Sequence, residues 1–299
     1  MTDKPNVEKS EQFVQTKYLR DVAHRALQYL DSGLCVHFSG PSGVGKTSMA
    51  MLVAKNLERP YSVIYGNNDY TTSDLIGGNF GYRRKKKVDN FIHNVYTMEE
   101  DFQLKWLDKQ LTTACREGHV LIYDEFSRTR PEINNIFLSV LEEGTLFLPS
   151  FESTDPYVKV HPDFRLIFTS NPAEYAGVHK TQVALEDRMV TIQLSGMDRE
   201  TEIAVTVAHS GIDDERARKI VGLVWDFRDT LANDSCSVRT CIKIGKVLSL
   251  TSNRPASDIP IDDIFLDILL SEFRHKEVNK EYMEQKIKSL VNSYFPQKV

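Results

Sequence analysis

The fold of this chain is decided by the stretch Gly40-Pro41-Ser42-Gly43-Val44-Gly45-Lys46-Thr47. An apolar run at residues 34–38 precedes the stretch, and a helical pattern at residues 48–57 follows it. Between a strand and a helix, glycines let the backbone curl so that successive N–H groups point at phosphate oxygens. The sequence therefore predicts a phosphate-binding loop that extends to Ser48, in the first turn of the helix.

Two side chains of the loop have predicted chemical roles. Lys46 is expected to reach the outer phosphates as a mobile cation, and Thr47 is expected to offer its hydroxyl to Mg²⁺. The helix N-terminus adds a partial positive charge. A glycine-rich turn with a surface lysine is the alternative, but the strand before and the helix after favour phosphate binding.

A second signal lies at the end of a later apolar run. Residues 119–123 have the composition of a buried strand and lead into Asp124 and Glu125. In open parallel sheets, ligands bind at the carboxyl ends of the strands. Asp124 is expected to hold Mg²⁺ through its water, and Glu125 to orient or deprotonate the attacking water. An acidic turn after a strand is the alternative for such a pair taken alone.

Length and composition limit the classes of protein to which this chain can belong. The chain has 299 residues, of which 41% are hydrophobic, enough for one large domain or two smaller ones. No apolar run reaches the roughly 18 residues that span a bilayer, and the polar start at residues 1–12 lacks a signal-peptide core. We therefore expect a cytoplasmic protein without a membrane anchor.

The four cysteines show no pairing pattern. They are Cys35, Cys115, Cys236 and Cys241, with no C-x-x-C spacing among them. Cys35 lies in a strand that is expected to be buried. The pattern predicts reduced thiols, with neither a zinc site nor a disulfide framework.

Charge argues against nucleic acid as the main partner, because the net charge is −5. One basic run, residues 83–87, is the exception and has the sequence Arg-Arg-Lys-Lys-Lys. The run could bind phosphates or an acidic protein surface, but basic runs of this kind are more often solvated loops.

Strand and helix patterns alternate along the first two thirds of the chain. Strands are expected at 34–38, 62–65, 119–123, 165–170 and 190–194, with helices at 11–31, 48–57, 103–116, 131–142 and 181–186. An irregular insertion is expected at 71–99 and a β-hairpin at 146–160. The pattern predicts an α/β fold with a five-stranded parallel sheet and flanking helices.

The character of the sequence changes after Gly196. Amphipathic helices are expected at 200–209, 213–232, 238–250, 261–274 and 280–294. We therefore predict a nucleotide-binding α/β domain at residues 1–196 and an all-helical lid domain at residues 197–299.

The order of these motifs resembles the AAA+ ATPases, and its details resemble their MoxR branch, over roughly residues 15–275. Thr169-Ser170-Asn171-Pro172 ends the fourth predicted strand, and Asn171 matches the sensor 1 position, a polar group beside the γ-phosphate. Asn-Pro after a strand is otherwise ordinary turn chemistry. The resemblance implies a P-loop NTPase that binds ATP and Mg²⁺.

Two arginines match further positions of that family. Arg188, just before the last strand, matches an arginine finger that reaches the nucleotide of a neighbouring subunit. Arg239, in Ser237-Val238-Arg239-Thr240, matches sensor 2, although Val238 stands where many relatives have proline. The alternatives are a helix-end cap for Arg188 and a salt-bridged surface role for Arg239.

Both insertions support the MoxR branch. The segment that begins Thr71-Thr72-Ser73-Asp74-Leu75-Ile76-Gly77-Gly78 resembles its helix-2 insertion, and the hairpin at 146–160 resembles its pre-sensor hairpin. In AAA+ rings such elements face the pore or a partner protein. Phe147, Phe151 and Tyr157 are therefore either substrate-contacting residues or ordinary hairpin packing.

Within the branch, the sequence most resembles the gas vesicle protein N family, through residues 123–132 and 171–182. The resemblance implies an ATP-hydrolysing assembly factor that forms a homo-hexamer and acts on gas vesicle shell or accessory proteins in the cytoplasm. The alternatives are a nucleic-acid-directed ATPase, supported by the basic run alone, and a nucleotide-switched scaffold. Intact Glu125, Asn171 and Arg188 argue against the scaffold.

Overall fold

The computed structural model describes residues 14, 16–87, 98–149, 156–171, 177–179, 183–231, 236–252, 259–273 and 279–296. The chain divides into two compact units. The first unit comprises Met1–Arg25, Gly40–Leu52 and Gln193–Val299, and the second comprises Ala26–Ser39 and Val53–Ile192. The phosphate loop therefore groups with the C-terminal residues, whereas the domain boundary at residue 196 stays a prediction.

A five-stranded sheet forms the centre of the fold, in the order β2-β5-β8-β1-β9. Its strands are β1 (Cys35–Ser39), β2 (Tyr61–Tyr65), β5 (Val120–Asp124), β8 (Arg165–Ser170) and β9 (Met189–Gln193). The pairs β2–β5, β5–β8 and β1–β8 are parallel. Every residue of β5 is buried, as expected for a strand covered on both faces. The predicted parallel α/β sheet is confirmed.

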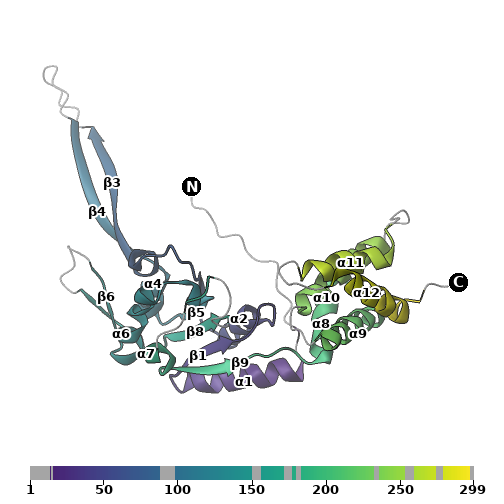
Figure 1. The fold of residues 1–299 in the computed structure, drawn as a ribbon. Helices are drawn as coiled ribbons and strands as arrows, with labels where there is room; N and C mark the ends of the chain where they lie inside the picture. Colours follow the sequence, from purple (N-terminus) through teal and green to yellow (C-terminus); the bar gives the residue numbers. More distant parts are fainter. Residues whose placement is uncertain are drawn as a thin grey trace. The chain divides into compact units, whose positions relative to one another are not determined.

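Helices precede the first of these strands and occupy most of the connections between them (Figure 1). They are α1 (Lys17–Asp31), α2 (Lys46–Asn56), α3 (Thr72–Ile76), α4 (Gln110–Glu117), the 3₁₀ turn η1 (Phe126–Arg128), α5 (Pro131–Asn134), α6 (Ile136–Glu142) and α7 (Val183–Glu186). The single helix predicted at 131–142 is divided at Asn135. The part of the predicted first helix before residue 14 lies outside the described residues.

The segment after α3 differs from its prediction. A two-stranded antiparallel hairpin, β3 (Gly77–Lys87) and β4 (Met98–Asp108), projects from the second unit where an irregular insertion was expected (Figure 1). The helix predicted at 103–116 is therefore wrong over residues 103–108. Apolar and polar residues alternate from Phe102 to Trp106, which is the period of a strand. Helix α4 begins only at Gln110.

The predicted hairpin at 146–160 is present as the antiparallel pair β6 (Thr145–Phe147) and β7 (Tyr157–Lys159). Phe147 and Tyr157 are 51% and 57% exposed, and their ring centroids lie 5.5 Å apart. Phe151 lies outside the described residues. The two described aromatic side chains therefore contact each other and also face solvent.

An aromatic cluster forms the core of the second unit. Phe168 lies 4.7 Å from Phe126, 5.4 Å from Phe137 and 6.0 Å from Tyr123 between ring centroids. Burial raises the pKa of the Tyr123 phenol to about 12, although a hydrogen bond to Thr129 opposes this effect. Tyr123 therefore stays a neutral donor, and its hydroxyl donates to Thr129 Oγ1 at 2.7 Å.

The C-terminal part of the first unit is helical, as predicted (Figure 1). Its helices are α8 (Arg199–Ser210), α9 (Asp214–Leu231), α10 (Val238–Ser252), α11 (Ile261–Ser271) and α12 (Lys280–Tyr294). Asp198 caps α8 by accepting a 2.7 Å hydrogen bond from the Thr201 N–H, and Gly211 ends this helix at φ 72°. Phe227 and Phe265 are fully buried in the helical core.

Burial also decides the chemistry of the cysteines. All four are buried, and Cys35 lies in β1 as expected. Burial raises the pKa of the Cys115 thiol to about 12 and raises the pKa values of Cys35 and Cys241. These three thiols therefore stay protonated and poorly nucleophilic. Among the described helices, none is both long and apolar enough to cross a bilayer.

Phe168→Ala is expected to lower the free energy of unfolding by about 3–5 kcal/mol, because it opens a cavity in the aromatic cluster. Phe147→Ala is the matched control, since Phe147 is 51% exposed and its loss should cost at most about 1 kcal/mol. Urea denaturation of both variants measures the difference. Equal destabilisation by the two substitutions would contradict the assigned core.

Candidate nucleotide site

The phosphate loop has the backbone geometry that the sequence predicts. Gly43 and Gly45 have φ values of 86° and 89°, in the left-handed region where side chains are strained. Helix α2 begins at Lys46, so Thr47 and Ser48 lie in its first turn. A glycine-rich turn at a helix N-terminus presents backbone N–H groups and a partial positive charge to an anion.

Lys46 is held against this loop. Its side chain is buried, and Nζ donates to the carbonyl oxygens of Gly40 at 2.9 Å and Pro41 at 2.7 Å. The contacts fold the lysine back over the loop that precedes it. The ammonium group of Lys46 therefore lies against the phosphate loop, where the sequence predicts that phosphate binds.

The start of helix α10 packs against the same loop. A Cβ added to Gly43 would lie 2.3 Å from Ser237 Oγ and 3.7 Å from Arg239 Cδ. Arg239 is exposed, and its backbone N–H donates to Ser237 Oγ at 3.3 Å. The structure thus brings the predicted sensor 2 arginine beside the phosphate loop.

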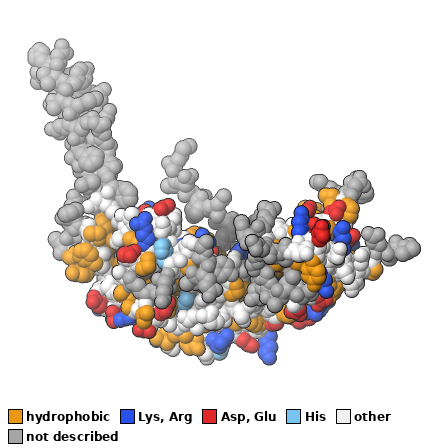
Figure 2. All heavy atoms as spheres, viewed as in Figure 1, with side chains coloured by type: hydrophobic (Ala, Val, Ile, Leu, Met, Phe, Trp, Pro, Cys, Tyr) orange, Lys and Arg blue, Asp and Glu red, His pale blue; other side chains and the backbone are white. Residues whose placement is uncertain are grey.

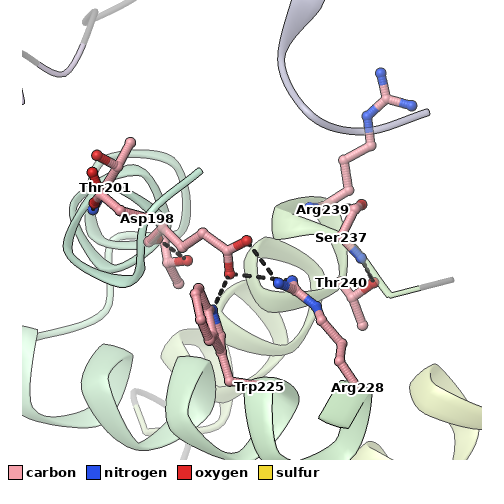
Figure 3. A network of polar contacts seen from close by, with 9 residues as sticks. Asp198, Thr201, Trp225, Arg228, Ser237, Arg239 and Thr240 are labelled. Carbon is pink, nitrogen blue, oxygen red and sulfur yellow. Dashed lines mark hydrogen bonds and ion pairs between the residues drawn. The ribbon is translucent and has the colours of Figure 1, made fainter. Parts of the chain in front are cut away.

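A cavity beside the loop has the ion pair of buried Glu202 and half-buried Arg228 in its wall. Figure 3 shows Arg228 and Trp225 within this polar network. Glu202 is 3% exposed and accepts hydrogen bonds from Arg228 Nη1 at 2.8 Å, Arg228 Nη2 at 3.1 Å and Trp225 Nε1 at 2.9 Å. Burial lowers the pKa of the Arg228 guanidinium, but the hydrogen bonds and charge of Glu202 outweigh burial and raise it. The cavity is further lined by residues 41–44, 195–197 and 236–238.

In the second unit, a threonine joins the two predicted carboxylate residues. Thr169 Oγ1 donates to Asp124 Oδ1 at 2.5 Å and accepts from the Glu125 N–H at 2.9 Å. Asp124 is 6% exposed, whereas Glu125 is half-buried. The hydroxyl therefore fixes the end of β5 against the adjacent strand β8.

Glu125 has an unusual backbone conformation. Its φ is 51°, which is left-handed and costly for a residue with a side chain. Gly66, after β2, approaches so closely that an added Cβ would lie 2.0 Å from the Glu125 carbonyl oxygen. Only glycine fits at position 66, where the N–H also donates to the Asp124 carbonyl oxygen at 2.7 Å.

Other predicted residues of this edge have partners that the sequence did not indicate. The Glu125 carboxylate forms an ion pair with Nε of Arg128. Asn171 follows β8 and is 8% exposed. Arg188 donates to the Ala184 carbonyl oxygen, near the end of α7, and forms an ion pair with Glu142. These contacts match the helix-end alternative for Arg188, and its role toward a neighbouring subunit stays a prediction.

The predicted site residues thus form two groups. Lys46, Thr47, Ser48 and Arg239 lie in the first unit, and Asp124, Glu125, Asn171 and Arg188 lie in the second. Sequence reasoning assigned no role to Thr169 or Ser237, although both stand within two residues of a predicted site residue. The position of Thr169 near the carboxyl end of a buried strand was the available signal.

Comparisons with known proteins identify the family to which this chain belongs. The AAA domain family (dynein-related subfamily) matches residues 36–189. The chain is 42% identical over 290 residues to the gas vesicle ATPase GvpN of Ancylobacter aquaticus, covering 95% of this chain and 81% of that protein. It is 40% identical over 292 residues to the gas vesicle ATPase GvpN of Haloferax mediterranei, covering 96% and 83%.

A solved structure supports the fold alone. A RuvB mutant of Thermotoga maritima matches 96% of this chain and 80% of its own with a TM-score of 0.52, at 16% sequence identity. The family match spans the sheet strands from β1 to β8, and the two GvpN proteins align over nearly the whole chain. The chain therefore belongs to the AAA-domain ATPases and, among them, to the GvpN family.

Proposed function

We propose that this chain couples ATP hydrolysis to gas vesicle assembly by acting on a protein partner. The observation that carries the proposal is the Thr169 hydroxyl, which holds Asp124 and Glu125 together at the carboxyl edge of the sheet. The gas vesicle role is inferred from the two GvpN relatives, which are 42% and 40% identical to this chain.

The phosphate loop fits a nucleoside triphosphate. The left-handed glycines leave room for phosphate oxygens to approach the backbone, and side chains at these positions would clash with Ser237 or Met197. Lys46 would neutralise the outer phosphates, and Arg239 would contact phosphate from helix α10. The loop residues 40–48 would therefore bind ATP, with Arg239 completing the pocket.

The oxygen donors fit Mg²⁺. Thr47 offers a hydroxyl and the buried Asp124 offers a carboxylate, both of which are ligands that Mg²⁺ prefers. When bound with the nucleotide, Mg²⁺ neutralises charge on the phosphates. Glu125 would orient the attacking water and accept its proton. Asn171 would place its polar side chain beside that water.

The surface gives little support to nucleic acid as a partner. Basic and acidic side chains are mixed over the described face in Figure 2, and the net charge is −5. In the β3–β4 register, Arg84, Lys85 and Lys86 lie opposite Asp101, Glu100 and Glu99.

The projecting hairpins are the surfaces we assign to the protein partner. The β3–β4 hairpin extends away from the sheet (Figure 1). The β6–β7 hairpin exposes the contacting pair Phe147 and Tyr157. Exposed aromatic side chains are common anchors in protein interfaces. The partner would be a gas vesicle shell or accessory protein, bound by a homo-hexamer of this chain in the cytoplasm.

Lys46→Ala is expected to weaken ATP binding at least about tenfold, because it removes charge-assisted phosphate contacts. Glu125→Gln should leave ATP affinity nearly unchanged and lower turnover at least about a hundredfold, because it removes water activation alone. Equilibrium binding of a fluorescent ATP analogue and steady-state phosphate release measure the two effects. Wild-type binding and turnover by Lys46→Ala would contradict the phosphate-loop assignment.

Arg188→Ala is expected to lower turnover at least about a hundredfold with little change in ATP affinity, if Arg188 acts across a subunit interface. Mixing Arg188→Ala with Glu125→Gln subunits should then restore measurable hydrolysis, because some interfaces pair an intact glutamate with an intact arginine. Glu142→Gln is the matched control, since it removes the ion pair of Arg188 within the chain. Loss of activity in Glu142→Gln together with no rescue in mixed rings would assign Arg188 to the helix end.

A further inference from the structure

The turn that carries Glu125 is anchored from three neighbouring segments. Phe126 is fully buried in the aromatic cluster. The Ser127 carbonyl oxygen accepts a 2.7 Å hydrogen bond from the His179 N–H, and Thr129 Oγ1 accepts one from the Asn67 N–H at 3.1 Å. The backbone of the turn is therefore held in place, and its exposed side chains are the parts that can move.

His179 links the segment after β8 to the segment after β2. Its Nε2 lies 2.9 Å from Asn68 Oδ1, while its backbone N–H binds Ser127. Arg130 Nε donates to the Asn68 carbonyl oxygen at 3.0 Å. The loops that follow three adjacent strands of the sheet thus meet around the Glu125 turn.

Arg128 reaches back to the Glu125 carboxylate from within this turn. The two form an i,i+3 ion pair through Nε and Oε2, and their side chains are 48% and 37% exposed. The Arg128 backbone N–H also donates to the Glu125 carbonyl oxygen at 2.9 Å. The carboxylate predicted to activate water is therefore engaged by a cation of its own turn.

We propose that Arg128 is a positioning residue that restrains Glu125 and limits the rate of water activation. The guanidinium occupies one oxygen of the carboxylate, and that oxygen is then not free to contact a water. The side chain of Glu125 is also drawn toward Arg128, along its own turn. The inference rests on the proposed role of Glu125 as the water-activating base.

The exposure of the pair makes this restraint reversible. Ion pairs between solvent-exposed side chains contribute little free energy, so other contacts of Arg128 can release the carboxylate. His179 N–H binds the carbonyl oxygen of Ser127, the residue next to Arg128, so the backbone beside Arg128 is held while its side chain is exposed.

The test is steady-state ATP hydrolysis by the full chain with saturating Mg²⁺. Arg128→Ala should raise kcat about two- to fivefold at nearly unchanged KM, because removing a weak exposed ion pair frees the carboxylate. Arg128→Lys should give a smaller rise, since the ammonium keeps the charge without the guanidinium geometry. A rise in rate cannot result from damage to the fold.

Arg130→Ala is the matched control, because Arg130 is a neighbouring exposed cation that binds the Asn68 carbonyl oxygen. It should keep the wild-type rate. The double variant Glu125→Gln, Arg128→Ala should be as inactive as Glu125→Gln alone. A lower or unchanged kcat in Arg128→Ala, or an equal rise in Arg130→Ala, would overturn the restraint while leaving the role of Glu125 intact. Turnover by Glu125→Gln itself would instead overturn the proposed base.

Discussion

The hydroxyl of Thr169 is the contact on which the carboxylate edge of the sheet depends. A buried carboxylate without a partner costs several kcal/mol, and Asp124 is 6% exposed. Thr169 donates to that carboxylate and accepts from the Glu125 N–H, so one group satisfies two neighbouring residues. Because β5 and β8 are adjacent and parallel, the strand register places this hydroxyl where both can reach it. The sheet topology therefore fixes the Asp124 carboxylate and the backbone of Glu125 before any ligand binds.

The left-handed backbone of Glu125 follows from the same constraint. A conformation that costs about 1–3 kcal/mol persists only where its surroundings determine it. Gly66 lies close to the Glu125 carbonyl oxygen, and the residue that follows Glu125, Phe126, is fully buried. In the first unit, the left-handed Gly43 packs against Ser237 in a comparable way. At both places a close backbone approach, which only glycine permits, positions a predicted functional side chain.

Local signals in the sequence were sufficient for most of the fold. The strand, glycine loop and helix around Lys46 follow from nearest neighbours in the chain, as do the five C-terminal helices. The β3–β4 hairpin was missed because its pairing joins residues up to 31 positions apart, such as Gly77 and Asp108, and its basic run hid the strand pattern. The ion pair of Arg188 with Glu142 spans 46 residues and has no local signature. Long-range contacts therefore account for what sequence reasoning could not predict.

The most direct test of the account is ATP turnover by Thr169→Val, compared with Thr169→Ser. Valine keeps the shape of threonine but leaves Asp124 and the Glu125 N–H without the hydroxyl. The account predicts that Thr169→Val retains ATP binding through the phosphate loop and loses at least about tenfold in kcat. Thr169→Ser, which keeps the hydroxyl, should recover most of the rate. Wild-type turnover by a folded Thr169→Val variant would contradict the proposed arrangement of the two carboxylates.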